Sequence, residues 1–386
     1  MNRQKICIIG GSLTGLTTAI CLSKLNCEID LIVGKNNQSF KSNRTIAISQ
    51  HNFDFLKKLD ISKTFNKYAW MSSVMKLYTS NENTKFSEIF ELNNENKQKK
   101  ILYVLENSKI NQLMMEKIKR IKNIKLIKNE EITKISNSGL LKSIKVKKKN
   151  FRYNLIIICT GGRSNLIKSL FNDKIIKSSY DETSVTTILK HDPVKNNIVR
   201  QIFLDNEIIA LLPINQTKTS IVLSLKKDLK NSKSYIKEKI KFYSSNYFKN
   251  IKFSSNIESR DLNFLLREKY FKDRTLLFGD ALHVIHPFVG QGFNMILRDL
   301  SSLKKILEKK INLGLDIGSQ DILSEFSDEV KASNFAFSIS TDILKNSFSI
   351  NNNNYKKIRN DILKNLNKNN FAKNIFFDIA DKGIKF

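Results

Sequence analysis

Glycine, proline and tryptophan are scarce in this sequence. Its 386 residues include 13 Gly, 3 Pro and 1 Trp, whereas Lys, Asn and Ile are abundant throughout. A coding bias towards A and T would produce this composition, and a glycine that survives under such a bias is expected to have a steric role. The hydrophobic fraction of 41% is high enough for a substantial core and excludes a wholly disordered chain.

Long apolar runs are also missing. No segment reaches the 18 or so consecutive apolar residues of a membrane span, and the first apolar run is too short for a secretory signal. The few cysteines show no C-x-x-C spacing, which predicts buried thiols in a reducing compartment. These cysteines are Cys7, Cys21, Cys27 and Cys159. We therefore expect a cytoplasmic protein, with peripheral contact at the inner membrane face left open.

Acidic residues are few. The 36 Asp and Glu face 66 Lys and Arg, which gives a formal net charge of +30 and a pI of about 9.8. Two interpretations stay open, a solvated Lys-rich surface that reflects composition or a selected attraction to anions. The lysine clusters are not interleaved with aromatic residues in the manner of nucleic-acid binders, so we expect no nucleic-acid partner.

The first glycine cluster lies in a strand–turn–helix–strand segment. Ile6 to Ile9 is a continuous apolar run, Gly10 to Gly15 forms the turn, and Ile29 to Val33 is the second apolar strand. In such a βαβ unit, amides at the helix start meet a pyrophosphate. Ser12 replaces the middle glycine of G-x-G-x-x-G, and Lys35 follows the second strand without the usual acid. A nucleotide site and a plain tight turn both stay open on this segment alone.

The middle of the chain changes pattern. Short β-prone runs cover 184–189, 198–204, 208–214 and 219–225 with polar loops between them, which predicts an antiparallel sheet inserted after the nucleotide fold. A helical pattern follows at about 232–246. The end of the chain is expected to be helical and basic.

Another glycine cluster occupies residues 276–299. A strand delivers Gly279 and Asp280, and Gly290 to Gly292 opens a helix. A carboxylate at a strand end can accept hydrogen bonds from a polyol chain, and amides at a helix start suit the negative charge of a reduced flavin. His283 and His286 have H-x-x-H spacing, but one nearby acid and a following proline make a poor metal site. A Ser164–His283–Asp280 triad lacks a nucleophile elbow.

Residues 279–299 resemble the G-D-A-x-H-x-x-x-P-x-x-G-Q-G-x-N-x-x-x-x-D signature of class A flavoprotein monooxygenases, and most resemble the hydroxylases of ubiquinone biosynthesis. Four further segments are similar to that family: 44–49 to R-A-I-A-L-S, 103–107 to Y-V-V-E-N, 210–213 to A-L-L-P, and 341–349 to its T-D-x-L-x-x-x-F-S helix. The family's D-G-x-x-S motif aligns on 160–164, with Thr160 in the place of Asp and with Arg163 inside it. This departure puts reduction by a pyridine nucleotide in doubt.

The resemblance implies an α/β fold, in which a discontinuous Rossmann-like FAD-binding domain carries an inserted antiparallel-sheet substrate domain and a helical C-terminal segment. The expected boundaries are 1–176 and 263–330 for the FAD-binding domain, 177–262 for the substrate domain and 331–386 for the C-terminal segment. No side-chain acid or base is assigned, and no metal is expected. The residues expected at FAD are Gly10, Ser12, Gly15, Arg44, Gly161, Gly279, Asp280, Pro287, Gly290, Gln291, Gly292 and Asn294.

The resemblance further implies FAD-dependent hydroxylation of a polyprenylated phenol by O₂, through a flavin C4a-hydroperoxide, with NAD(P)H as the reductant. Partners from a quinone-biosynthesis complex are also implied. Two alternatives stay open: a flavin-dependent hydroxylase or reductase of another small substrate, and a non-catalytic scaffold subunit. The basic and apolar residues between 355 and Phe386 leave two interpretations open: peripheral membrane contact, or aromatic residues packed onto the FAD domain beside solvated lysines.

Overall fold

The computed structural model describes residues 3–34, 42–61, 65–80, 86–93, 100–130, 132–147, 149–162, 164–171, 174–205, 207–227, 232–287 and 290–384. Lys35, Arg163 and Phe386, which entered the sequence analysis, lie outside these ranges.

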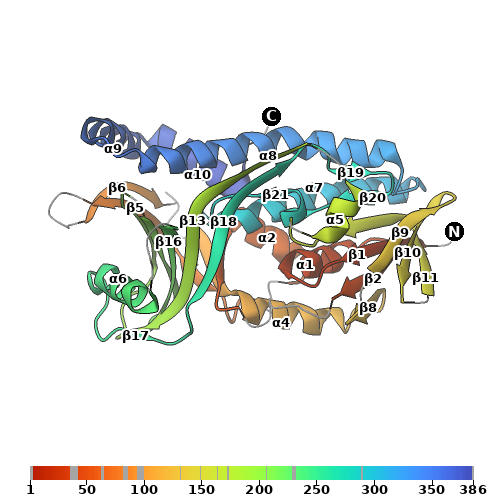
Figure 1. The fold of residues 1–386 in the computed structure, drawn as a ribbon, viewed down its shortest axis with the longest axis horizontal. Coiled ribbons are helices and arrows are strands. Elements are labelled where there is room, and N and C mark those ends of the chain that lie inside the picture. The colour runs from red at the N-terminus through yellow and green to blue at the C-terminus, as the bar shows by residue number, and fades with distance from the viewer. Residues whose placement is uncertain are drawn as a thin grey trace.

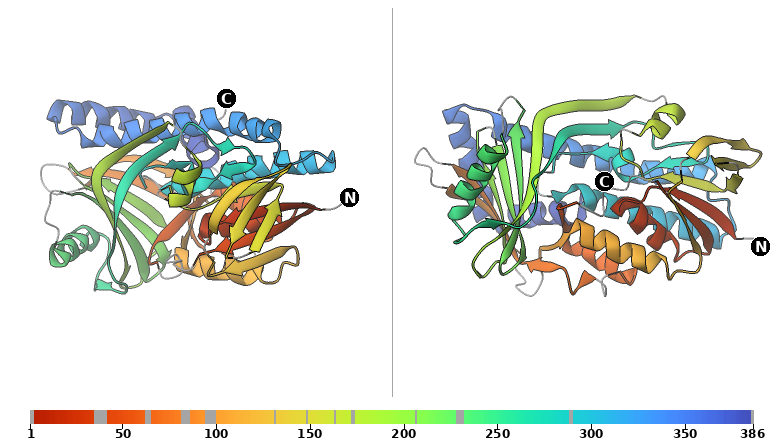
Figure 2. Two further views of the ribbon diagram at one scale, coloured as in Figure 1. Left: turned by 45° about the vertical axis from the view of Figure 1, so that its right-hand side comes forward. Right: turned by 60° about the horizontal axis from the view of Figure 1, so that its bottom comes forward.

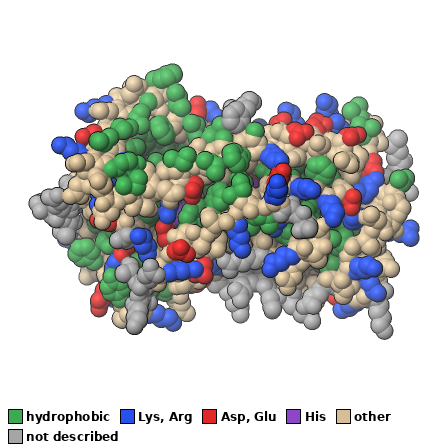
Figure 3. Space-filling model, turned by 45° about the horizontal axis from the view of Figure 1, so that its top comes forward, with side chains coloured by type: hydrophobic (Ala, Val, Ile, Leu, Met, Phe, Trp, Pro, Cys, Tyr) green, Lys and Arg blue, Asp and Glu red, His purple; other side chains and the backbone are tan. Residues whose placement is uncertain are grey.

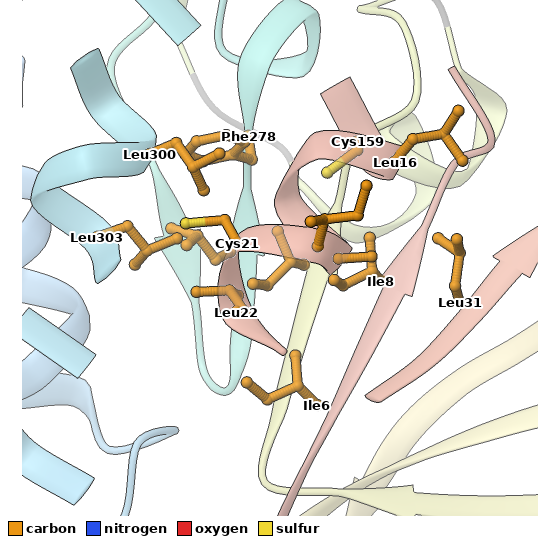
Figure 4. Packing of buried hydrophobic residues seen from close by; sticks show 14 of the residues in the cluster. Ile6, Ile8, Leu16, Cys21, Leu22, Leu31, Cys159, Phe278, Leu300 and Leu303 are labelled. Atoms are coloured by element: carbon orange, nitrogen blue, oxygen red, sulfur yellow. The ribbon is translucent and has the colours of Figure 1, made fainter. Parts of the chain in front are cut away.

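A mostly parallel sheet forms the centre of the first domain. Its strands are ordered β19 (Phe271–Lys272), β20 (Thr275–Leu277), β12 (Leu155–Ile158), β1 (Gln4–Ile9), β2 (Cys27–Val33) and β8 (Ile124–Lys128), and only β19 pairs antiparallel. The apolar runs form the central strands β1, β2, β12 and β20, which are mostly buried on both faces, whereas β8 and β19 at the two edges are more exposed. Figure 4 shows α1 (Leu13–Leu22) packed between this sheet and α7 (Gly292–Asn312), with Cys21 and Leu303 in the interface.

The four cysteines are confirmed as buried, free thiols. Burial raises the pKa of the Cys21 and Cys159 thiols to about 12, which makes both of them unreactive at neutral pH.

Smaller elements complete this domain. Three antiparallel strands, β9 (Ile132–Ser138), β10 (Leu141–Val146) and β11 (Lys149–Tyr153), form one separate sheet, and β3 (Thr45–Ser49), β7 (Leu102–Glu106) and β4 (Trp70–Ser72) form another. The remaining helices are α2 (Gln50–Lys58), α4 (Asn107–Ile118), α5 (Asn165–Leu170) and the 3₁₀ turn η2 (Gly279–Ala281).

A nine-stranded, mostly antiparallel sheet forms the second domain (Figure 2). Its order is β21 (His283–Val284), β18 (Glu258–Arg267), β13 (Ile175–Lys190), β16 (Lys218–Lys226), β15 (Glu207–Asn215), β14 (Ile198–Phe203), β5 (Val74–Ser80) and β6 (Phe86–Asn93), and β17 (Lys252–Phe253) pairs with β13. Helix α6 (Lys233–Ser245) covers one face through Ile236 and Ile240. The predicted inserted sheet is confirmed, and β5 and β6 join it from a much earlier part of the chain, where β5 runs parallel to β14.

The C-terminal segment is helical, as predicted. It consists of α8 (Gln320–Ser349), α9 (Asn353–Lys368) and α10 (Asn370–Lys382). Figure 1 shows α8 running along the top of the molecule, from the first domain to the nine-stranded sheet. In the described part of the chain, no helix combines the length and apolar character that a bilayer crossing requires. The expected domain boundaries stay predictions.

Candidate functional site

A cavity of about 520 Å³ lies between the two domains. Six of the residues expected at FAD line it, and they come from the first domain: Ser12, Arg44, Asp280, Pro287, Gly290 and Gly292. The opposite wall comes from the nine-stranded sheet and includes Ser184, Thr186, Gln201, Ala210, Leu212, Val222 and, on β18 beside Ser184, Arg260. A smaller cavity of about 200 Å³ shares the wall formed by Arg44, Asp280 and Pro287.

The tight turn after β1 brings Ser12 to the cavity wall, and two glycines make this turn possible. Gly10 has φ +135°, and a Cβ there would lie 2.8 Å from the carbonyl oxygen of Cys159. A Cβ on Gly15 would lie 2.0 Å from the carbonyl oxygen of Gly10. These two glycines do not line the cavity; they let α1 begin directly against the strand ends. Ser12 is the N-cap of α1 and, within the described residues, makes no side-chain capping bond, so the first amides of α1 stay available to an anion.

Asp280 lies on η2, directly after β20. Its side chain is accessible from the cavity, and no described residue forms a hydrogen bond with its carboxylate. The neighbouring glycine is required, because Gly279 has φ +66° and a Cβ there would lie 2.5 Å from Cγ2 of Thr14. Backbone packing therefore places an unpaired carboxylate in the cavity, where it can accept hydrogen bonds from hydroxyl groups.

Two arginines give the same region positive charge. Arg44, just before β3, and Arg260, on β18, both line the cavity. Burial and the nearby Arg260 lower the pKa of Arg44, while Asp280 and Glu258 act in the opposite direction. Glu258 also fixes the two residues that precede Arg44, because its carboxylate accepts hydrogen bonds from the Ser42 hydroxyl and the backbone amide of Asn43. Sequence reasoning missed Arg260, since a single arginine on an inserted strand belongs to no recognisable local pattern.

The start of α7 forms another part of the wall. Gly290 has φ +66°, and a Cβ on it would lie 3.3 Å from Cβ of Ala47, whereas a Cβ on Gly292 would enter open space. Asn294 is fully buried behind this wall and donates from Nδ2 to the carbonyl oxygen of Ala47 at 2.9 Å. The Gln291 side chain also lies behind the wall rather than in the cavity. Gly290 and Gly292 thus face the cavity, and the side-chain amide of Asn294 supports this wall from behind.

The turn after β12 lies beside the cavity and does not line it. Gly161 has open space around its Cα. The Thr160 hydroxyl is buried and lacks a hydrogen-bond partner among the described residues. A Cβ on Gly162 would lie 2.9 Å from the carbonyl oxygen of Asp280, so this turn packs against η2.

The two histidines of the H-x-x-H pair take different partners. His283 Nε2 lies 2.9 Å from Asp299 Oδ2, and His286 Nε2 lies 3.1 Å from Glu182 Oε2. His283 thus contacts Asp299 and not Asp280, which leaves no Ser–His–Asp geometry. Within the described ranges, no group of three metal-ligating side chains occurs.

These residues fit FAD. The amides at the start of α1 and the guanidinium of Arg44 suit a pyrophosphate, and the unpaired Asp280 suits a ribityl chain. Gly290 and Gly292 leave space where a flat ring system would lie against backbone. The fit rests on backbone positions where a side chain would fill the space and on the Asp280 carboxylate, to which no described residue donates a hydrogen bond.

Comparisons with known proteins agree with this geometry. The family described as FAD binding domain matches residues 3–332. The mitochondrial ubiquinone biosynthesis monooxygenase COQ6 of Dictyostelium discoideum is 24% identical, over 98% of this chain and 91% of that protein. The ubiquinone hydroxylase UbiM of Neisseria meningitidis is 20% identical, over 59% of this chain and 50% of that protein.

The fold also matches solved structures. The p-nitrophenol 4-monooxygenase PnpA from Pseudomonas putida DLL-E4 superposes with a TM-score of 0.82, covering 100% of this chain and 99% of that one at 14% sequence identity. At this identity the match establishes the fold, and it confirms the predicted architecture.

Proposed function

The chain belongs to the FAD binding domain family, and on that premise we propose that it is an FAD-dependent monooxygenase that hydroxylates the aromatic ring of a polyprenylated phenol in ubiquinone biosynthesis. One observation carries this proposal: the cavity has one wall that fits FAD and a facing wall of apolar and neutral polar side chains on β13, β14, β15 and β16, while Arg260 on the neighbouring strand β18 adds a cation. The similarity to a ubiquinone biosynthesis monooxygenase over nearly the whole of both chains supports the choice of substrate.

The FAD wall is expected to work through its backbone and two charged side chains. Amides at the start of α1 and Arg44 would hold the pyrophosphate, Asp280 would accept hydrogen bonds from the ribityl hydroxyls, and Gly290 and Gly292 would leave room for the ring system. When bound, FAD supplies the activation of O₂ and the transfer of one oxygen atom. The protein positions this chemistry and excludes water from it, and NAD(P)H is the reductant that we propose.

The facing wall is expected to hold the aromatic ring. Ala210, Leu212 and Val222 form an apolar surface, and Ser184 and Thr186 add hydroxyl groups beside it. An apolar surface with a few polar groups orients a small aromatic compound without holding it as an ion. The polyprenyl chain makes the substrate nearly insoluble in water, so the enzyme must collect it from a bilayer.

We propose that α9 and α10 make the peripheral membrane contact. Ile358, Ile362, Phe371 and Ile375 are 60%, 54%, 76% and 44% exposed. Basic residues accompany them on these helices: Lys357, Lys364, Lys368 and Lys373. Figure 3 shows hydrophobic side chains gathered on the face that carries the C-terminal helices. Apolar groups beside cations suit an anionic leaflet, at about 1 kcal/mol for each cation before screening.

The same helices also pack inward, so membrane contact involves only part of the segment. Phe377 and Ala380 pack against the core residues Met75 and Leu102, which means that deleting the segment would damage the fold. Point substitutions therefore test the contact. Phe371→Ser with Ile375→Ser should reduce co-sedimentation with anionic liposomes, whereas Leu140→Ser, at an 84% exposed site far along the sequence, should not. Equal binding of both variants to the liposomes would contradict the proposed membrane contact. Partner proteins of a quinone-biosynthesis complex would then be expected to deliver the polyprenylated substrate.

Lipid extraction tests the proposed function. A strain that lacks this protein should accumulate a polyprenylated phenol with one ring oxygen fewer than the next intermediate. The wild-type chain should restore ubiquinone and Asp280→Ala should not, because the ribityl chain loses its acceptor. Full restoration by Asp280→Ala would favour a scaffold subunit, and accumulation of a different, water-soluble aromatic compound would favour the alternative substrate.

A further inference from the structure

The end of α10 is joined to the interior of the FAD-binding domain. Asp381 is buried, its Oδ1 accepts a hydrogen bond from the backbone amide of His51 at 2.8 Å, and its carbonyl oxygen accepts one from the Ser49 hydroxyl at 3.0 Å. His51 lies in the first turn of α2, which contains no acidic residue of its own. Asp381 therefore supplies the carboxylate that the amino terminus of α2 favours, from more than 300 residues away in the chain.

The contact continues from Ser49 to the cavity wall. The backbone amide of Ser49 donates to Asn294 Oδ1 at 2.9 Å, and Asn294 Nδ2 donates to the carbonyl oxygens of Ala47 and Gly290 at 2.9 and 3.3 Å. Ala47 and Gly290 both line the cavity. A chain of buried hydrogen bonds thus connects the C-terminal helix to the backbone on which the FAD ring would lie.

A second buried chain starts from α8. Lys345 Nζ lies 2.6 Å from Glu182 Oε1, and the other oxygen of Glu182 lies 3.1 Å from His286 Nε2. All three side chains are buried, and His286 directly precedes Pro287 in the cavity wall. The two chains of contacts therefore reach the cavity wall at two points shortly before the start of α7, Gly290 and Pro287, through different residues and different helices.

We propose that the C-terminal helices are part of the flavin site, with Asp381 and Lys345 as positioning residues that hold the backbone around Gly290 and Pro287. This inference rests on the proposed function. In the described structure, no residue of α8, α9 or α10 lines the cavity, so their effect on FAD passes through Ser49, Asn294 and His286. A segment that contacts a bilayer would thereby also control how well the cavity is formed.

Asp378 provides a matched control for Asp381. It lies on the same helix with a 58% exposed side chain, and it pairs only with Lys382 among the described residues. We expect Asp381→Ala to raise the dissociation constant of FAD about tenfold, measured by quenching of flavin fluorescence, because the His51 amide at the start of α2 loses its acceptor, while the Ser49 hydroxyl keeps the backbone carbonyl of residue 381. Asp381→Asn keeps an acceptor oxygen and should recover most of the affinity, and Asp378→Ala should resemble the wild type.

Hydrogen exchange of the FAD-free protein gives a second readout. In Asp381→Ala and in Lys345→Met, the amides of 290–297 should exchange faster, while those of β1 stay protected. A variant that is merely less stable overall would lose protection in both regions. If Asp381→Ala showed the same hydrogen exchange at 290–297 and the same FAD affinity as the wild type, the inference would be overturned. Failure of the wild-type protein itself to bind FAD would instead contradict the proposed function.

Discussion

The two walls of the cavity are built in different ways. The FAD wall consists of turns in which the backbone itself approaches the cavity, as at Gly290 and Gly292, while Gly10 and Gly15 bring the chain into place behind it. The facing wall consists of side chains from separate strands, such as Ser184 on β13 and Ala210 on β15. Where the backbone must lie close to the cavity, only glycine fits, and it must stand at fixed positions in the sequence. A position on the face of a strand can be occupied by many different apolar residues. Mutations on the two walls should therefore differ in kind.

The largest effect is expected in the turn after β1. In Gly15→Ala the new Cβ would lie 2.0 Å from the Gly10 carbonyl oxygen, so the turn must open and the protein should lose FAD and much of its stability. Gly34→Ala is the control, because a Cβ there meets nothing within 4 Å. Thermal unfolding and flavin content check this expectation. Equal flavin content in the two variants would contradict the packing role of Gly15.

On the FAD wall, Asp280→Ala is expected to lower the affinity for FAD without disturbing the fold. Loss of a charge-assisted acceptor should weaken FAD binding by roughly 1.5–3 kcal/mol, about ten- to a hundredfold, with the fold retained. Fluorescence titration measures the dissociation constant. An unchanged constant would mean that the ribityl chain lies elsewhere.

On the facing wall, the size of a side chain is expected to control binding of the aromatic substrate. Ala210→Phe fills space in the cavity from β15, so the KM for the aromatic substrate should rise by about tenfold or more while the dissociation constant of FAD stays within about twofold. Ala210→Ser, which adds one oxygen atom, should change both values little. If Ala210→Phe lost FAD as readily as Asp280→Ala does, the two walls would not be separate sites.

The smallest change in stability is expected at Glu182, which lies on β13 of the nine-stranded sheet and contacts both His286, next to the cavity wall, and Lys345 on α8. Burial alone would raise the pKa of Glu182, but hydrogen bonds from His286 and Lys345 lower it below its usual value of 4.5. A carboxylate with a lowered pKa stabilises the fold above its usual pKa, and this stabilisation is lost as the pH falls through the lowered value. Glu182→Gln should thus cost about 1–2 kcal/mol near pH 7 and less below about pH 4.

Urea unfolding of both proteins at several pH values measures this difference. A cost that stays constant from pH 7 to below pH 4 would show that the charge of Glu182 is not what stabilises the cluster.

The comparison also explains which parts could be predicted from the sequence. The strand β1, the turn at Gly10 and the residues 279–299 follow local rules of burial and backbone geometry, and they were found. Pairing of β14 with β5 joins segments more than 100 residues apart, and no local pattern signals it. Arg260 and Asp381 act through partners that only the folded chain brings near, so sequence reasoning missed them.

Mass spectrometry of the product formed under ¹⁸O₂ tests the central claim most directly. The purified protein would be loaded with FAD and given NAD(P)H and a prenylated phenol. The account predicts a ring-hydroxylated product that carries one ¹⁸O atom, formed by the wild type and, at FAD concentrations near the wild-type dissociation constant, strongly reduced in Asp280→Ala. Oxidation of NAD(P)H with an unmodified phenol, or a product whose new oxygen comes from water, would contradict it.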